Sequence, residues 1–228
     1  PGCMEGELLA CATLRVAGDM LRLPQTSVAT ALVLFHRYHA RRTFDAARKH
    51  RVVGGCLLLA LKSTESPRKV RDVLNVMHAL EAPGEPALEV GERFWKLRDQ
   101  LVATEQDVLR CVGFQVKIDL PHAYLLNMVK QLRIESDLAL LACGILNDSF
   151  HTNLCIHYAP EQIAAGCLYL GLCTKNRPVR FPNWHELLGA SLEDVEAIAM
   201  RVVALYEQYK RTPMPAELSG VAEPQPSG

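Results

Sequence analysis

The chain has 228 residues, 49% of them hydrophobic and 22% charged, which is enough for one large domain or for two of about 100 residues, each with its own core. Its 25 Lys and Arg residues balance its 25 Asp and Glu residues, so no net field draws the chain to nucleic acid or anionic lipid, and a protein is the simpler partner. No apolar run reaches the ~18 residues that a membrane-spanning helix requires, and no signal peptide is visible.

Hydrophobic side chains recur with the period of an α-helix along nearly the whole chain, and no useful length alternates as a β-strand does. A first series of helices is predicted at about 6–22, 25–41, 45–63, 67–79 and 88–113. A second series is predicted at about 121–132, 136–150, 160–174, 184–189 and 192–210. Proline near four of the helix starts, where a missing N–H is harmless, supports these limits. The sequence therefore predicts an all-α fold.

Two segments lack the helical period. The stretch EAPGEPALEV, residues 81–90, is the one long loop expected between helices. The last residues, 212–228, are rich in Pro, Gly and Ser, and we expect them to be disordered. The expected organisation is an N-terminal domain over 1–118, a C-terminal domain over 119–211 and a disordered tail.

An internal repeat indicates that the two domains are copies of one unit. The segment VVGGCLLLAL from Val52 lies over IAAGCLYLGL from Ile163, with a Gly, a Cys and three Leu in common. An offset of 111 residues, from 52 to 163, is far longer than a solenoid repeat and favours a duplicated unit of about 100 residues and five helices. A helix that is apolar on all sides must be central, and Gly54 and Gly55 allow a neighbouring helix to approach closely.

The first apolar segment ends on Lys62, and Cys173 takes the equivalent place in the second copy. A glutamate is common to both fifth helices, where Glu105 lies loosely over Glu196. If the third and fifth helices of the first copy end together, Lys62 and Glu105 present opposite charges on one surface. Because the second copy lacks the cation, the fold does not need it, and we interpret the pair as a recognition device.

Catalytic and metal-binding signals are not found. The sequence has no Walker motif, no G-x-G-x-x-G, no H-E-x-x-H and no nucleophile elbow. His36 and His39 lie three apart on a helix, but no third ligand is suggested. We therefore expect a non-catalytic protein without metal, cofactor or small-molecule ligand. The eight cysteines form no C-x-x-C and sit mostly in apolar segments, which favours buried thiols in an intracellular compartment.

The sequence resembles the cyclins, the regulatory subunits of cyclin-dependent kinases, which carry two five-helix cyclin boxes in tandem. The similarity rests on LRLPQTSVATALVLFHRYH (21–39), LALKSTESPRKVRDVLNV (59–76) and EQDVLRCVGFQV (105–116), which resemble the second, third-to-fourth and fifth helices of the first box. In the second box NDSFHTNLCIHYAPEQIAAGCLYL (147–170) is similar to the transcription-related cyclins L, K, T and Q. The resemblance implies a heterodimer with a cyclin-dependent kinase, in the nucleus or the cytoplasm.

Within that branch, GEPALEVGERFWKLRDQLV (84–102) and GFQVKIDLPHAYLL (113–126) look most like cyclin Q, also called cyclin M. Cyclin Q implies the tenth cyclin-dependent kinase as partner. RLPQ and RDVLNV in the first box also resemble cyclin L, which leaves a cyclin L-like partner of a transcription or splicing kinase as the alternative. A second alternative is a nucleic-acid-bound transcription adaptor with a cyclin-like fold, but the balanced charge argues against the basic surface that it needs.

The resemblance also implies a kinase-binding site. In the family, the Lys that ends the third helix and the Glu in the fifth grip the C-helix region of the kinase, and apolar positions flank this contact. The residues implied are Lys62, Glu105, Leu59, Glu65, Leu109 and Phe114. The first Glu of the common Lys-x-Glu-Glu is replaced by Thr64, which leaves Glu65 alone. The implied mechanism is positional, because a partner that prefers the active C-helix arrangement shifts the kinase toward it.

Four of these residues have a simpler explanation that the sequence leaves open. Lys62 fits an ordinary cation at a helix C-terminus, Glu105 fits a solvated helix charge, and Leu109 and Phe114 fit core positions. Trp95 is predicted to anchor the fifth helix in the core.

A basic cluster formed by Arg68, Lys69 and Arg71 lies at a predicted helix start. It fits a solvated face, or a site for an acidic or phosphorylated kinase segment.

Overall fold

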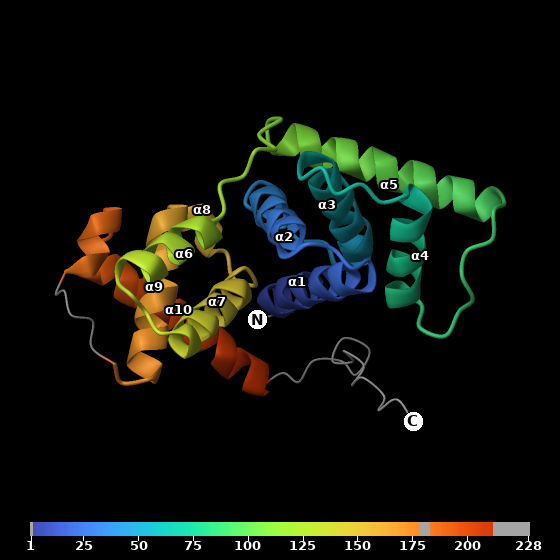
Figure 1. Ribbon diagram of the computed structural model, residues 1–228. Helices are drawn as coiled ribbons and strands as arrows, with labels where there is room; N and C mark the ends of the chain where they lie inside the picture. The colour runs from blue at the N-terminus through green and yellow to red at the C-terminus, as the bar shows by residue number, and fades with distance from the viewer. Residues whose placement is uncertain (1, 178–182, 212–228) are drawn as a thin grey trace, which may run out of the picture. The chain divides into compact units, whose positions relative to one another are not determined.

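The computed structural model describes residues 2–177 and 183–211, and every regular element in that part of the chain is a helix (Figure 1). The chain divides into two compact units, one formed by residues up to 118 and one that begins at residue 119, and each is described by itself. The predicted all-α fold of tandem five-helix units is confirmed. The predicted disordered tail, 212–228, lies outside the described residues.

The first unit contains five α-helices and a 3-10 turn. They are α1 (Gly2–Met20), α2 (Gln25–His39), η1 (Ala46–Arg48), α3 (Lys49–Ser63), α4 (Val70–Glu81) and α5 (Glu92–Cys111). The second unit contains α6 (Pro121–Gln131), α7 (Ser136–Ser149), α8 (Leu154–His157), α9 (Pro160–Thr174), η2 (Trp184–Leu188) and α10 (Leu192–Arg211).

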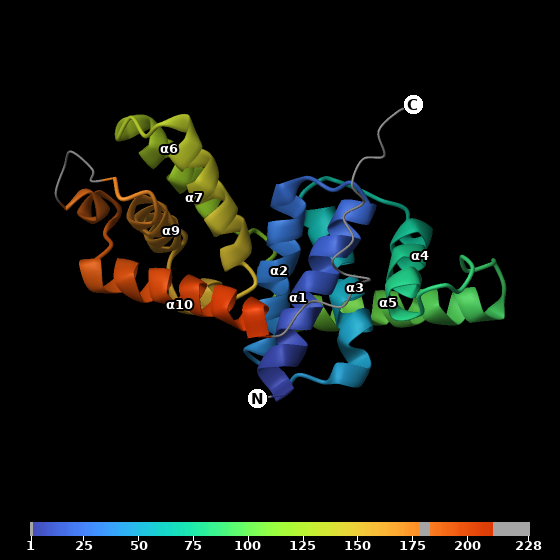
Figure 2. The ribbon, with the colours of Figure 1, turned by 90° about the horizontal axis from the view of Figure 1, so that it is seen from below.

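A central helix organises each unit. All ten residues from Val52 to Leu61 on α3 are buried, and α3 packs against α1, α2, α4 and α5 (Figures 1 and 2). In the second unit α9 packs in the same way against α6, α7, η2 and α10. The two repeated apolar segments are thus the centres of the two units, as an all-round apolar surface predicts.

Glycines at equivalent positions of the repeat let each central helix meet the fifth helix of its unit. A Cβ at Gly55 would lie 3.1 Å from the backbone N of Glu105 on α5. A Cβ at Gly166 would lie 2.6 Å from Cβ of Ile198 on α10. Since carbon contacts are favourable at about 3.5 to 4 Å, neither helix pair can pack this closely with a larger residue. The predicted close approach at Gly55 is confirmed.

A tyrosine–aspartate hydrogen bond joins the second helix to the fifth in each unit, with donor and acceptor exchanged. Tyr38 on α2 donates to Asp107 Oδ2 on α5 at 2.9 Å, whereas Tyr206 on α10 donates to Asp148 Oδ2 on α7 at 3.0 Å. Burial, reinforced by the Asp107 hydrogen bond, raises the pKa of Tyr38 to about 12, so its hydroxyl remains a donor. Both copies of the fold therefore have a tyrosine–aspartate hydrogen bond between these helices, but the tyrosine and the aspartate have exchanged helices.

Some predicted boundaries are wrong for local reasons. The helix expected from 45 begins as the 3-10 turn η1. Asp45 Oδ1 accepts a hydrogen bond from the Ala47 N–H at 2.9 Å, and this bond stabilises the 3-10 turn. The helix expected at 184–189 is the 3-10 helix η2, which lies between left-handed residues at Asn183 and Gly189, with φ of 55° and 63°. The single turn α8 was not predicted, since four residues carry no period.

We expect Gly166→Ala to destabilise the protein by about 1–3 kcal/mol, the usual cost of overfilling a packed core. The added methyl must displace α10, because Ile198 Cβ is too close for a rotamer change to relieve the contact. Urea unfolding monitored by circular dichroism measures the change.

The matched control is Gly144→Ala on α7, where an added Cβ meets nothing within 4 Å. Alanine should there stabilise the helix by up to about 1 kcal/mol. Equal unfolding midpoints for the two variants would contradict the packing account.

Candidate functional site

The predicted charge pair between α3 and α5 exists, but its two halves differ in exposure. Lys62 Nζ lies 2.6 Å from Oε1 and 2.8 Å from Oε2 of Glu105. The lysine side chain is 62% exposed and the glutamate side chain only 7%. The predicted proximity is confirmed, and Glu105 is not a solvated helix charge. The expectation that both charges lie on the surface is wrong for Glu105, because α5 packs against Gly55 at this point.

The pair presents an ammonium group in a fixed place. Lys62 lies in the last turn of α3, where the helix dipole favours a cation, but the dipole alone does not account for a carboxylate buried beneath it. An ammonium has three donors, and Glu105 contacts it from one side. The exposed side of Lys62 therefore offers a partner a positive charge that is already held in position.

The end of α3 is closed by a Schellman turn. The Ser66 N–H donates to the Leu61 carbonyl at 3.0 Å, and Glu65 has a left-handed backbone with φ of 52°. Glycine usually takes this position, so an exposed glutamate there carries a conformational cost of about 1 kcal/mol or more. Thr64 Oγ1 lies 2.7 Å from Ser27 Oγ, and this hydrogen bond links the end of α3 to α2.

Phe114 follows α5 in a turn of the same kind, in which Gly113, with φ of 65°, takes the place of Glu65 and Phe114 that of Ser66. Its N–H donates to the Leu109 carbonyl at 3.0 Å, its φ is 62°, and 68% of the residue is exposed. The core explanation is therefore wrong for Phe114. Leu109 is half-buried, and Leu59 is buried. An aromatic ring that is exposed on a strained backbone contributes little to the fold and suits contact with another molecule.

Trp95 is not the core anchor that the sequence predicted. Trp95 is 47% exposed, and the core position belongs to Phe94, which is 5% exposed. The Arg98 guanidinium lies 4.7 Å from the indole centroid. α5 begins at Glu92 rather than near 88, and both views show its first turns extending beyond α4 (Figures 1 and 2). Only one side of the helix packs on the unit there, and Phe94 occupies that side.

Arg68 is not part of a solvated face. Its Nε donates to the Leu21 carbonyl at 3.2 Å and its Nη2 to the Arg22 carbonyl at 3.1 Å, just beyond the end of α1. These bonds hold the segment before α4 in an extended form, so the helix begins at Val70 rather than 67. Lys69 and Arg71 are exposed.

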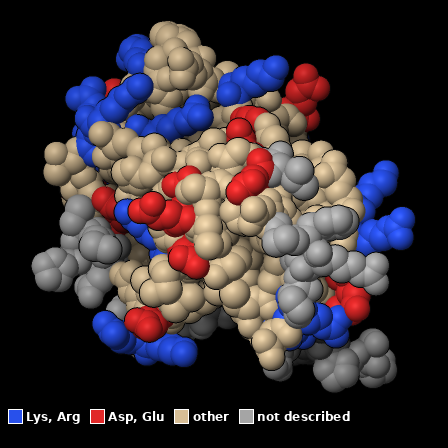
Figure 3. Space-filling view, turned by 90° about the vertical axis from the view of Figure 1, so that its left-hand side faces the viewer, with Lys and Arg blue, Asp and Glu red and all other residues tan. Residues whose placement is uncertain are grey.

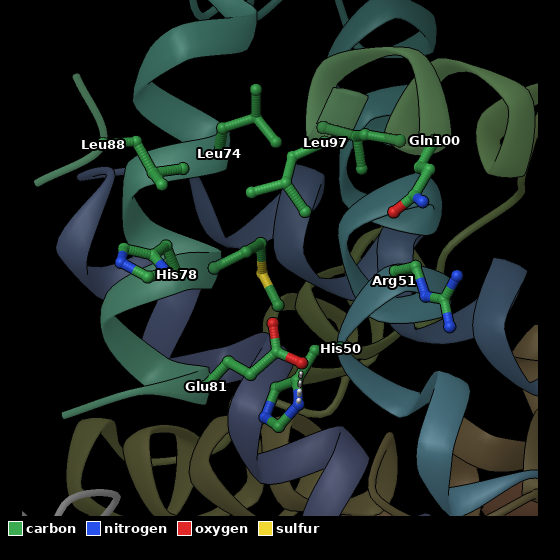
Figure 4. Close-up of a pocket in the computed structure, with 10 residues that line it drawn as sticks. His50, Arg51, Leu74, His78, Glu81, Leu88, Leu97 and Gln100 are labelled. Carbon is green, nitrogen blue, oxygen red and sulfur yellow. Dashed lines mark ion pairs between the residues drawn. The ribbon is translucent and has the colours of Figure 1, made fainter. Parts of the chain in front are cut away.

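Figure 4 shows an apolar pocket between α3, α4 and α5, at whose edge His50 turns toward Glu81. His50 Nδ1 and Glu81 Oε1 are 4.0 Å apart. Burial lowers the pKa of His50, so the imidazole is mainly neutral at pH 7 and the ionic contact is weak. The cavity volume is about 40 Å³, which holds a few water molecules rather than an organic ligand.

The two histidines considered as metal ligands and the cysteine thiols contact other groups of the protein. Among the described residues no three His, Cys, Asp or Glu side chains gather into a metal-ligand group. His36 Nε2 lies 3.7 Å from Cys11 Sγ, and His39 Nδ1 lies 3.3 Å from the Arg42 carbonyl. Burial raises the pKa of the Cys167 thiol to about 12, as expected of a structural cysteine.

In the described part of the chain, no helix has the length and apolar character needed to cross a membrane.

The corresponding surface of the second unit carries no such pair. Cys173, at the position of Lys62, is exposed. Glu196, which aligns loosely with Glu105 in the sequence, is also exposed and accepts a hydrogen bond from Tyr169 Oη at 3.3 Å. The same helix packing therefore forms without the cation, so the charge pair is not a requirement of the fold.

Comparison with known proteins finds two adjacent family matches. The cyclin N-terminal domain matches residues 11–117, and the cyclin C-terminal domain matches residues 120–221. Cyclin-L2 of Mus musculus is 33% identical over 210 residues, which cover 89% of this chain. Cyclin-L1 of Gallus gallus is 32% identical over 213 residues, 90% of this chain. The chain spans about 40% of the length of these relatives.

Solved structures share the fold at lower identity. A chain of the yeast RNA Pol II CTD kinase CTDK-1 complex superposes with a TM-score of 0.79 at 17% identity, over 93% of this chain and 70% of that chain. A viral cyclin from herpesvirus saimiri superposes with a TM-score of 0.64 at 16% identity, over 87% of this chain and 83% of that chain.

We expect Lys62→Met to lower the free energy of unfolding by about 1–3 kcal/mol, because it leaves the buried Glu105 carboxylate without its ammonium partner. Adding Glu105→Gln should recover part of the loss, since a neutral amide costs less to bury than a charge. Urea unfolding of the wild type, both single variants and the double variant gives the coupling energy. An effect of Lys62→Met that is the same with and without Glu105→Gln would show that the pair does not matter for stability.

Proposed function

The chain belongs to the cyclin family, and from this premise we propose that it is the activating regulatory subunit of a cyclin-dependent kinase, with Lys62, Glu105 and Phe114 at the centre of the kinase contact. The observation that carries the proposal is the combination of a buried carboxylate, a lysine fixed above it and an exposed, strained phenylalanine in one unit. None of these features is needed for packing the core.

The proposed contact supplies binding energy rather than a catalytic group. Lys62 would donate to acceptors in the C-helix region of the kinase, while Phe114 and the exposed edge of Leu109 provide apolar area. Because Glu105 already holds the lysine, little side-chain entropy remains to be lost on binding. A subunit that binds the active C-helix position more tightly than the inactive one shifts the kinase population toward activity.

Leu59 and Glu65 have different parts in this proposal. Leu59 is buried one turn before Lys62, so it supports the lysine from within the unit rather than touching the kinase widely. Glu65 is exposed directly after α3, and its backbone is left-handed. Glu65 is therefore the acidic member of the proposed surface.

The identity of the kinase is a finer part of the proposal. The similarity of residues 84–102 and 113–126 to cyclin Q supports the tenth cyclin-dependent kinase, whereas the relatives at 32% and 33% identity are cyclins L1 and L2. We propose the tenth kinase first and a cyclin L-type transcription kinase second. A role in the nucleus accords with both.

The alternative of a nucleic-acid-bound adaptor finds little support in the charge distribution. On the face shown in Figure 3, most Lys and Arg side chains lie toward the edges, and acidic side chains lie near the middle. A nucleic-acid surface requires a basic track whose affinity falls steeply with salt.

We expect the purified protein to form a complex with a cyclin-dependent kinase and to raise its activity on a peptide substrate. Affinity capture of the tagged protein from cells, followed by mass spectrometry, identifies the kinase, and reconstitution with the tenth cyclin-dependent kinase tests the finer proposal. Capture of a different cyclin-dependent kinase would overturn only the finer proposal. Recovery of no such kinase, with tight binding to duplex DNA at ~150 mM salt, would favour the adaptor.

We expect Phe114→Ala to weaken kinase binding by about tenfold or more, as loss of a central aromatic contact does. Free-protein stability should not fall, because the ring is exposed and contributes little to the core. Isothermal titration calorimetry with purified kinase and a thermal melt of the free protein measure the two quantities.

Met200→Ala is the matched control, since Met200 is 66% exposed on α10 of the second unit. Its kinase affinity should equal that of the wild type. Equal losses in the two variants would remove Phe114 from the proposed contact.

A further inference from the structure

The most basic stretch of the chain joins α2 to α3 and has no part in the kinase contact proposed above. Residues 37–51, RYHARRTFDAARKHR, hold five Arg and one Lys against one Asp, in a chain whose 25 cations balance 25 carboxylates. Two of the arginines serve the fold, since Arg37 donates to the Gln115 carbonyl and Arg41 to the Cys111 carbonyl. The remaining arginines require another explanation.

Three of them line an open cleft of about 500 Å³ that faces α5. Arg42 follows α2, Arg48 ends η1, and Arg51 lies in the first turn of α3. Arg51 also lines the apolar pocket of Figure 4, where its guanidinium group points away from His50 and Glu81. Three separate elements thus bring guanidinium groups to one cleft that is roomy enough for a ligand.

The carboxylate in the cleft compensates only part of this charge. Asp107 accepts a hydrogen bond from Tyr38 and lies 3.8 Å from Arg42 Nη2. Within the described part of the chain, neither Arg48 nor Arg51 has an ion-pair partner. Both flank the start of α3, whose first turn holds no acidic residue. Cations at this positive helix end are unfavourable without an anion.

We propose that this arginine cleft binds the phosphate of a phosphorylated serine or threonine in a partner protein. A phosphate dianion has three acceptor oxygens and matches the donor forks of two guanidinium groups, which bind it bidentately. Thr43 in the cleft wall adds a hydroxyl donor. Asp107 repels a second phosphate nearby, which favours an isolated phosphate over the continuous backbone of a nucleic acid.

The cleft is separate from the proposed kinase contact. Arg51 and Lys62 are 11 positions apart on α3, which corresponds to about 16 Å along the helix axis. On α5, Asp107 lies two residues after Glu105, so the two side chains point to different sides of the helix. The phosphate site therefore goes beyond the proposed kinase contact and can be tested without a kinase.

Fluorescence anisotropy at ~150 mM salt tests the proposal with two labelled peptide pools, randomised around a central phosphothreonine or a central threonine. We expect the phosphorylated pool to bind about tenfold more tightly or better. The variant Arg48→Gln/Arg51→Gln should lose this preference while keeping its thermal melt. The control Lys69→Gln/Arg71→Gln removes two exposed cations of the same unit outside the cleft and should keep it.

Three results would overturn the proposal. The first is equal binding of the two pools by the wild type. The second is the same loss in both double variants, which would indicate non-specific attraction. The third is tighter binding of a labelled 20-nucleotide RNA or DNA than of the phosphorylated pool, with loss in the cleft variant, which would assign the cleft to nucleic acid.

Discussion

The close approach of the third helix to the fifth is the constraint on which the rest of each unit depends. Gly55 lets the backbone of α5 come within contact of α3, and Gly166 does the same for α9 and α10. With the two backbones this near, a side chain that points inward from α5 at this level cannot reach water. Glu105 lies at this contact, next to Gly55, and its side chain is only 7% exposed.

A buried carboxylate needs a partner, and Lys62 is that partner. The buried carboxylate also orients the lysine, because both carboxylate oxygens hold the lysine at the helix end while its outer side stays exposed. This arrangement accounts for the abrupt end of the apolar run on a cation.

The second unit shows what the fold requires and what it does not. It repeats the central helix, the close glycine contact and the tyrosine–aspartate tie, yet it has Cys173 in place of the lysine and an exposed Glu196. Features present in both units belong to the architecture. In the first unit, the charge pair, the exposed Phe114 and the arginine cleft are not part of this shared architecture, and a partner is the better explanation for them.

The helices, the duplication and the central apolar segments could be predicted from the sequence, because they follow from local periodicity and from a repeat of 111 residues, from 52 to 163. Which side chains are buried where helices cross or end follows from the tertiary structure. It buried Glu105, exposed Trp95 and Phe114, turned Arg68 onto the end of α1 and gathered Arg42, Arg48 and Arg51 around one cleft. The reason is that exposure depends on contacts between residues far apart in the chain, and no local pattern records how closely two helices pack.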